Sequence, residues 1–180
     1  MESSYNHDDA RSEITATTGT TVRTPSTGSV VTVDEHRFRY RPLSHGNKFL
    51  IIERLSGKAI APKGNGGLCL QDLNEAGRAE SSWLCVESDG YLGLLNSKTG
   101  RYIGHNGKGV MQALVTNFGS WECITTRDQP GGGYKLLVPN WWYSLKTVVV
   151  AEDGKTLVKR DHGNTLWDFI QVADDGGLTT

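Results

Sequence analysis

The sequence contains little cysteine and proline and no long hydrophobic run. Its 180 residues include three cysteines and five prolines. The odd number of cysteines does not suggest a full set of disulfides, and the spacing of Cys69, Cys85 and Cys123 matches neither a zinc motif nor a redox C-x-x-C pair. We therefore expect free thiols in a reducing compartment and no metal site. No segment approaches the roughly 20 apolar residues of a membrane helix, and residues 1–6 lack the features of a secretory signal. These absences predict a cytoplasmic location and no membrane partner.

An excess of either sign of charge is also lacking. The chain carries 19 basic and 20 acidic side chains and a formal charge of −1. A near-neutral chain offers no general attraction to nucleic acid or to an anionic membrane, so neither is expected as a partner. The strings that mark a nucleophile elbow, an H-E-x-x-H site, a Walker loop or a dinucleotide fingerprint do not occur. The sequence therefore identifies no catalytic residue and predicts no cofactor.

Glycine and tryptophan, in contrast, are well represented. The 22 glycines, the five tryptophans and the short apolar runs are typical of an all-β protein with many tight turns. Residues 1–33 are dominated by Ser, Thr, Gly, Asp and Glu, which cannot bury enough apolar surface to offset the entropy of ordering. We therefore expect a disordered tail over residues 1–33 and a single domain over residues 34–180, since a chain of this length forms one domain by default.

The domain is built from an internal repeat. Three similar segments, at residues 49–52, 91–95 and 134–138, open units of about 43 residues, and three others, at residues 82–86, 120–124 and 166–170, close them. The glycine turns at Ser56-Gly57 and Thr99-Gly100 each indicate a hairpin near the start of a unit.

The units span about residues 46–90, 91–133 and 134–174, and each reads as four short strands, which makes about 12 strands in all. A propeller needs at least about four blades, so three units favour a closed barrel with a hairpin cap. In such a barrel, Trp83, Trp121 and Trp167 would fill one shared core, and the three cysteines would be buried near it.

The S-W-x-C-[VI] ends, the S/T-G-[KR]-x-I turns and Asp89-Gly90-Tyr91 at the start of the second unit resemble the β-trefoil superfamily, specifically its ricin-B-type lectin and fascin-like branches. The resemblance covers about 125 of the 180 residues. It implies ligand-binding loops and no particular reaction.

The resemblance to ricin-type lectins also implies a sugar site in each repeat, made by a carboxylate, an aromatic platform and an Asn near the closing tryptophan. The corresponding carboxylate and platform positions carry Ala61-Pro62 and Leu70-Gln71, then Gly104-His105 and Ala113-Leu114, then Lys146-Thr147 and Val158-Lys159. No repeat has the full set. Asn117 and Asn164 do stand just before the tryptophans of the second and third repeats.

Trp141, Trp142 and Tyr143 occupy the hairpin turn that the other repeats fill with glycine. An aromatic cluster at a turn indicates a ligand platform or a protein contact. The alternative is that the cluster caps the barrel mouth as part of the core. Neighbours on an extended chain face opposite ways, so we expect one of the two tryptophans to pack inward.

Ionisable residues on predicted loops complete the candidate site. His105 and His162 can act as acid or base near neutral pH, although the sequence supplies no partner for either. The predicted ligand-binding residues lie in the second and third repeats: Trp141, Trp142, Tyr143, His105, Asn117, Asp161, His162 and Asn164.

Three functions remain open at this point. The first is a module that binds a carbohydrate or glycoconjugate through the loops of the second and third repeats. The second is a protein-interaction module, fascin-like or inhibitor-like, that uses the aromatic turn as its hot spot. The third is a cofactor-independent enzyme acting on an apolar small molecule in an aromatic pocket, with His105, His162 or a tyrosine moving protons.

Overall fold

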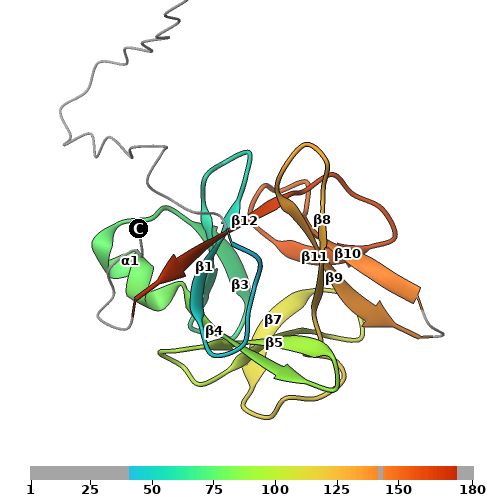
Figure 1. Ribbon diagram of the computed structural model, residues 1–180, viewed down its shortest axis with the longest axis horizontal. Coiled ribbons are helices and arrows are strands. Elements are labelled where there is room, and N and C mark those ends of the chain that lie inside the picture. Colours follow the sequence, from blue (N-terminus) through green and yellow to red (C-terminus); the bar gives the residue numbers. More distant parts are fainter. Residues whose placement is uncertain (1–40, 142–143, 174–180) are drawn as a thin grey trace, which may run out of the picture. The chain divides into compact units, whose positions relative to one another are not determined.

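The structure, a computed structural model, describes residues 41–141 and 144–173. The predicted tail, residues 1–33, lies outside the described residues, as do Trp142 and Tyr143 of the aromatic turn. The described part contains twelve β-strands and one short α-helix (Figure 1). None of its helices has the length and apolarity needed to cross a membrane.

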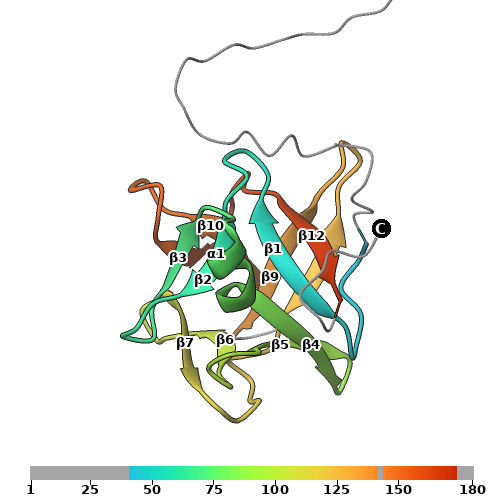
Figure 2. The same ribbon diagram turned by 90° about the vertical axis from the view of Figure 1, so that its left-hand side faces the viewer.

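Each repeat contributes four strands, as the sequence predicts. The first repeat contains β1 (Lys48–Glu53), β2 (Ala59–Pro62), β3 (Leu68–Gln71) and β4 (Ser82–Ser88), with the helix α1 (Glu75–Glu80) before β4. The second contains β5 (Tyr91–Asn96), β6 (Tyr102–His105), β7 (Met111–Val115) and β8 (Thr125–Asp128). The third contains β9 (Tyr134–Asn140), β10 (Ser144–Val150), β11 (Leu157–Arg160) and β12 (Trp167–Val172). The helix is an addition that only the first repeat has among the described residues, and it lies beside β2 (Figure 2).

The first and last strands of the repeats pair around a barrel. Strand β1 lies between β12 and β4, with Leu50 opposite Ile170 and Phe49 opposite Trp83. The ladders β4–β5, β8–β9 and β9–β12 continue this ring. The expected closure is only partial, because no ladder joins β5 to β8. A single bridge spans that gap, in which Leu92 and Ile124 exchange N–H···O bonds of 2.9 and 2.7 Å.

The two middle strands of each repeat form a hairpin, and neighbouring hairpins are tied together at one end of the barrel. The pairs are β2–β3, β6–β7 and β10–β11. The Ala113 N–H donates to the Gly66 carbonyl at 2.8 Å, and the Lys159 N–H donates to the Gly109 carbonyl at the same distance. Six barrel strands and three capping hairpins in threefold arrangement constitute a β-trefoil, which confirms the predicted fold.

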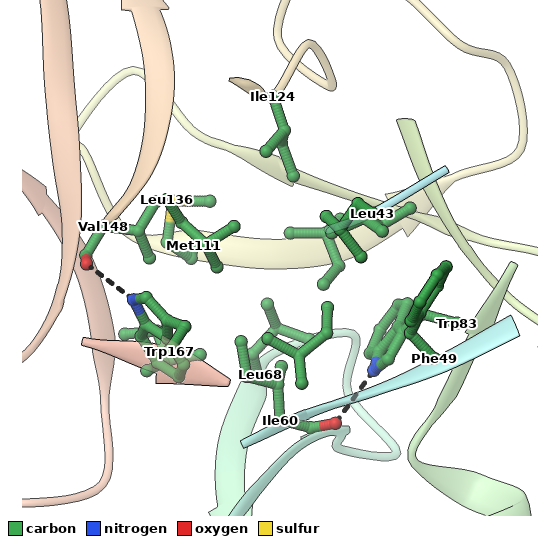
Figure 3. Close-up of a cluster of buried hydrophobic side chains, with 14 of the residues drawn as sticks. Leu43, Phe49, Ile60, Leu68, Trp83, Met111, Ile124, Leu136, Val148 and Trp167 are labelled. Carbon is green, nitrogen blue, oxygen red and sulfur yellow. Dashed lines mark hydrogen bonds between the residues drawn. The ribbon is translucent and has the colours of Figure 1, made fainter. Parts of the chain in front are cut away.

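The core lies inside the barrel, beneath the hairpins (Figure 3). Trp83 and Trp167 are fully buried, and their indole N–H groups donate to the Ile60 carbonyl at 2.9 Å and to the Val148 carbonyl at 3.3 Å. Each bond runs from the last strand of a repeat to the second strand of the same repeat. Each tryptophan therefore connects a barrel strand to the hairpin of its own repeat by a hydrogen bond. A buried indole needs such a partner, because an unpaired N–H costs about 1–3 kcal/mol.

The second repeat breaks this pattern and corrects two expectations. Trp121 is 45% exposed and lies outside the core, which takes Ile124 from this repeat instead. The reason is that β8 begins only at Thr125, so the tryptophan stays in the preceding loop. All three cysteines are free thiols, and Cys85 is buried as predicted, but Cys69 and Cys123 are only half-buried.

Candidate functional site

A pocket opens on the surface between the second and third repeats. It consists of two adjoining hollows of about 200 and 290 Å³, both lined by His105, Trp121, Asn140, Trp141 and Lys159. We call these five residues and the space that they enclose the inter-repeat pocket. His105 and Asn140 end β6 and β9, Lys159 lies in β11, and the two tryptophans lie in the loop before β8 and in the β9–β10 turn.

Two backbone hydrogen bonds bring these segments together. The bond from the Lys159 N–H to the Gly109 carbonyl places β11 beside the β6–β7 turn, and the His105 N–H donates to the Trp121 carbonyl at 3.3 Å. Gly109 has a positive φ of 81°, and a Cβ added there would lie 3.2 Å from the Cγ of Lys159. A glycine is therefore needed in this turn for two reasons: its backbone adopts a positive φ, and the absence of a Cβ leaves room for the Lys159 side chain.

The Trp121 loop is held by the residue that follows the tryptophan. The Glu122 side chain accepts a hydrogen bond from the Gly119 N–H at 3.1 Å, and the Glu122 N–H donates to the Gly119 carbonyl at 3.1 Å. A Cβ at Gly104 would come within 2.6 Å of the Glu122 carboxylate, so the carboxylate packs against bare backbone. Burial raises the pKa of Glu122, because a charge is costly in this poorly solvated position.

The aromatic wall of the pocket consists of two exposed indoles and one buried imidazole. Trp121 stacks on His105 with ring centroids 5.4 Å apart and planes inclined by 18°. Trp141 is 76% exposed and Trp121 is 45% exposed. Large exposed aromatic rings on both sides of one hollow are the usual sign of a binding surface.

His105 is buried and its hydrogen bonding determines which ring nitrogen carries the proton. Its Nδ1 lies 3.1 Å from the Asn106 carbonyl oxygen, which can only accept, so we assign the proton of the neutral ring to Nδ1. Nε2 then faces Lys159, whose Nζ is 3.5 Å away. Burial lowers the pKa of His105 and the Lys159 charge lowers it further, whereas hydrogen bonding to the Asn106 and Pro139 backbone carbonyls acts in the opposite direction. The imidazole is therefore neutral at neutral pH.

The cation of the pocket is Lys159, and its partners are uncharged. Its Nζ lies 3.2 Å from the Asn140 Oδ1 and 3.5 Å from the His105 Nε2. Burial and the nearby Lys146 lower the pKa of Lys159. Lys146 itself forms an ion pair with Asp161 at the edge of the pocket. Within the described part of the chain, no carboxylate lies within ion-pair distance of Lys159.

The structure brings only some of the predicted site residues together. His105, Trp141 and Asp161 line the hollows of the inter-repeat pocket. Asn164 lines a different hollow, of about 810 Å³, beside Leu55 and Leu166. Asn117 and His162 are exposed and line neither hollow, and Trp142 and Tyr143 lie outside the described residues.

Sequence reasoning missed Trp121, Asn140, Lys146 and Lys159. The sequence signal for Trp121 was ambiguous, because alternate residues of a strand face the same side. If Cys123 faces the core, Trp121 does so too, whereas if Ile124 faces the core, Trp121 faces outward. The W-x-C spacing shared with Trp83 and Cys85 favoured the first reading. The resemblance to ricin-type lectins did point to the positions of both lysines, but neither residue is the carboxylate or aromatic ring expected there. Across residues 41–141 and 144–173, no group of three His, Cys, Asp or Glu side chains could hold a metal ion.

Comparison with known proteins places the fold but no family. No family model matches the chain, and no curated protein matches its sequence. Among solved structures, the chain is similar to ThreeFoil, a designed threefold-symmetric protein, with 20% identity, a TM-score of 0.55, and coverage of 68% of this chain and 96% of that one. It is also similar to SeviL bound to the asialo-GM1 saccharide, with 16% identity, a TM-score of 0.54, and coverage of 71% and 98%.

A larger enzyme contains a similar segment. This is a GlcNAcα1-4Gal-releasing endo-β-galactosidase from Clostridium perfringens, with 20% identity and a TM-score of 0.62 over 71% of this chain and 33% of the enzyme. The chain thus spans about a third of the enzyme's length. At these identities the likeness shows the fold alone.

Proposed function

We propose that this chain is a carbohydrate-binding module and that it holds a sugar in the inter-repeat pocket. The observation that carries the proposal is the pairing of two exposed indoles, Trp121 and Trp141, with the polar groups of Asn140 and Lys159 in one hollow. An aromatic ring covers the apolar face of a pyranose, while fixed donors and acceptors bond to its hydroxyl groups.

The size of the pocket supports a small saccharide. Pockets for drug-sized ligands measure about 300–1,000 Å³. The two hollows, of about 200 and 290 Å³, are smaller and open, which suits one sugar ring in each and a chain that continues into solvent.

The structural neighbours support the same class of ligand, since one is bound to a saccharide and another is named for the galactose-containing glycans that it cleaves. Of the two branches that the sequence resembles, a ricin-B-type lectin module agrees better with an indole-lined pocket than a fascin-like module does. The pocket differs from the expected lectin triad, because it is shared by two repeats and Asp161, the carboxylate that lines it among the described residues, is already paired with Lys146.

The enzyme alternative receives less support. The barrel interior has only about 10 Å³ of free space among Ile60, Leu94, Met111 and their neighbours. The hollow of about 810 Å³ beside Leu55 is larger, but no aromatic ring and no imidazole of the described residues lines it. His105 is the one imidazole that lines the inter-repeat pocket within the described residues, and no nucleophile or carboxylate lies within hydrogen-bond distance of its ring. The protein-contact alternative also agrees with an exposed Trp141, but it predicts no affinity of the chain for free sugars.

The test is a glycan screen followed by titration calorimetry on the full chain, with Trp121→Ala and Trp141→Ala as site variants. Leu55→Ala is the matched control, because Leu55 is 95% exposed in the equivalent turn of the first repeat but lies on the other hollow. We expect each tryptophan variant to weaken sugar binding up to about tenfold, since stacking of this kind contributes about 0.5–1.5 kcal/mol, and the control to leave it unchanged. If no glycan binds at millimolar concentration, the proposal is wrong.

A further inference from the structure

The inter-repeat pocket is more basic than the chain as a whole. The chain carries a formal charge of −1, yet four basic residues and one acidic residue line the larger of the two hollows. These are Lys108, Lys146, Lys159, Arg160 and Asp161. The ion pair between Lys146 and Asp161 cancels one charge of each sign. Three cations then remain, and none of them forms an ion pair with another described residue.

Lys159 is the best placed of these cations. Its backbone is fixed by the Gly109 carbonyl, and its Nζ is held by the Asn140 Oδ1 and the His105 Nε2. An ammonium has three donors, so one remains to contact a ligand. Asn140 and His105 are neutral acceptors, so they leave the positive charge of Lys159 uncompensated. A hydrogen bond between an ammonium and an anionic oxygen is roughly twice as strong as one between neutral groups, which favours an anionic ligand group at the remaining donor.

We infer that the inter-repeat pocket selects sugars that carry a negatively charged group, a carboxylate or a sulfate ester, and that Lys159 contacts this group. The inference rests on the proposed function, because it takes the pocket to be a saccharide site. The indoles of Trp121 and Trp141 would cover the ring of the sugar, and the charged substituent would point toward β11.

Matched pairs of sugars test the inference. Binding to the full chain is measured by calorimetry for the methyl glycosides of galactose and galacturonic acid, of glucose and glucuronic acid, and of galactose and galactose 6-sulfate, with sodium sulfate as the anion without a sugar. We expect the acidic member of a pair to bind about tenfold more tightly at low ionic strength, the effect of one charge-assisted hydrogen bond. The difference should shrink at about 0.5 M salt, because salt screens the charges.

Charge variants locate the effect. In Lys159→Gln, affinity for the acidic sugar should fall about tenfold more than affinity for its neutral partner. Lys155→Gln, an exposed lysine in the β10–β11 turn that does not line the pocket, is the matched control and should change neither. Asp161→Asn should increase the preference for the acidic sugar, because it removes a carboxylate that lines the pocket and pairs with Lys146. Trp121→Ala should weaken both members of a pair equally.

The binding results distinguish a failure of the anion inference from a failure of the proposed sugar binding. Equal affinity for the two members of every pair would overturn the inference and leave carbohydrate binding intact. A preference that survives Lys159→Gln would show that another residue contacts the anion. If no sugar binds, or if sulfate alone binds as tightly as the sulfated sugar, both the inference and the proposed function are wrong.

Discussion

The indole of Trp121 lies over the imidazole of His105, with ring centroids 5.4 Å apart, and the His105 N–H donates to the Trp121 carbonyl. The same two residues are thus joined through side chain and backbone, so the loop before β8 and the end of β6 form one unit. The loop does not need Trp121 to fill the barrel, because Ile124 does so. The tryptophan is therefore available for binding.

Removing Trp121 should cost far less stability than removing Trp167. For Trp121→Ala we expect a loss of about 1.5 kcal/mol or less in the free energy of unfolding, because the side chain is 45% exposed. For Trp167→Ala, which empties a fully buried site, we expect about 3–5 kcal/mol or failure to fold. Urea denaturation followed by circular dichroism compares the two. Equal losses would mean that Trp121 belongs to the core after all.

Gly109 and Gly107 lie in the same turn and should respond differently to substitution by alanine. Gly109→Ala forces an alanine to a φ of 81° and brings its Cβ to 3.2 Å from the Lys159 Cγ, so we expect a loss of about 1–3 kcal/mol. Nothing lies within 4 Å of a Cβ at Gly107, and its φ is not positive, so Gly107→Ala should be neutral or slightly stabilising. Thermal unfolding of both variants measures the difference. A neutral Gly109→Ala would show that the turn does not constrain Lys159.

The fold could be predicted from the sequence because its signals are local and repeated three times. The glycine turns and the short apolar runs indicated the strands, and the equivalence of Trp83 and Trp167 indicated the core. The gap between β5 and β8 could not be predicted from the sequence. Residues 120–124, which were expected to form a strand, lie in the loop before β8, so they do not extend a ladder with β5. The prediction for Trp121 failed for the same reason, since a shift in the start of a strand reverses which side chains face inward.

The pocket could be predicted only in part, because it is formed by residues from two repeats. His105 and Trp141 stood out by their chemistry, but Lys159 becomes a site residue only because β11 bonds to the β6–β7 turn. Hydrogen bonds between hairpins of different repeats leave no local mark in a sequence. Asn164 shows the converse, because its position before a tryptophan suggested the same site, whereas it lines the hollow next to Leu55.

Glu122 should be replaceable by glutamine at neutral pH. Its pKa is raised in the folded chain, so its contribution to stability is fully present below the unfolded pKa of 4.5 and is lost as pH rises through the folded pKa. Glutamine carries no charge and retains an oxygen that can accept the Gly119 N–H. We expect Glu122→Gln to raise the free energy of unfolding at pH 7 by up to about 1 kcal/mol and to give a smaller gain at pH 4.

Glu122→Ala is the control for this substitution. It removes the acceptor as well as the charge, so it should destabilise the loop at both pH values by about 1 kcal/mol. If glutamine and alanine behave alike, the bond to Gly119 contributes nothing to the position of Trp121.

His105 should make the chain less stable in mild acid. Its pKa is lowered in the folded chain, chiefly by burial, so the unfolded chain binds a proton first. The stabilisation is present above the unfolded pKa of 6.5 and is lost as pH falls through the folded pKa. Urea denaturation at pH 7.5, 6.5 and 5.5 should therefore show a decline in the free energy of unfolding for the unmodified chain. In His105→Gln the decline should be smaller, because glutamine does not titrate.

A bound anion should reverse this trend at the pocket. An imidazolium 3.5 Å from the Lys159 Nζ is unfavourable in the empty site, but a ligand carboxylate or sulfate that contacts both groups from the pocket would compensate for both charges. Affinity for the acidic sugar should therefore rise as pH falls toward the lowered pKa of His105, whereas affinity for its neutral partner should fall or stay constant. Asp161 is already paired with Lys146, which lowers the pKa of its carboxyl, and it should not titrate in this range. If both sugars show the same pH dependence, His105 acts on the shape of the pocket and not on its charge.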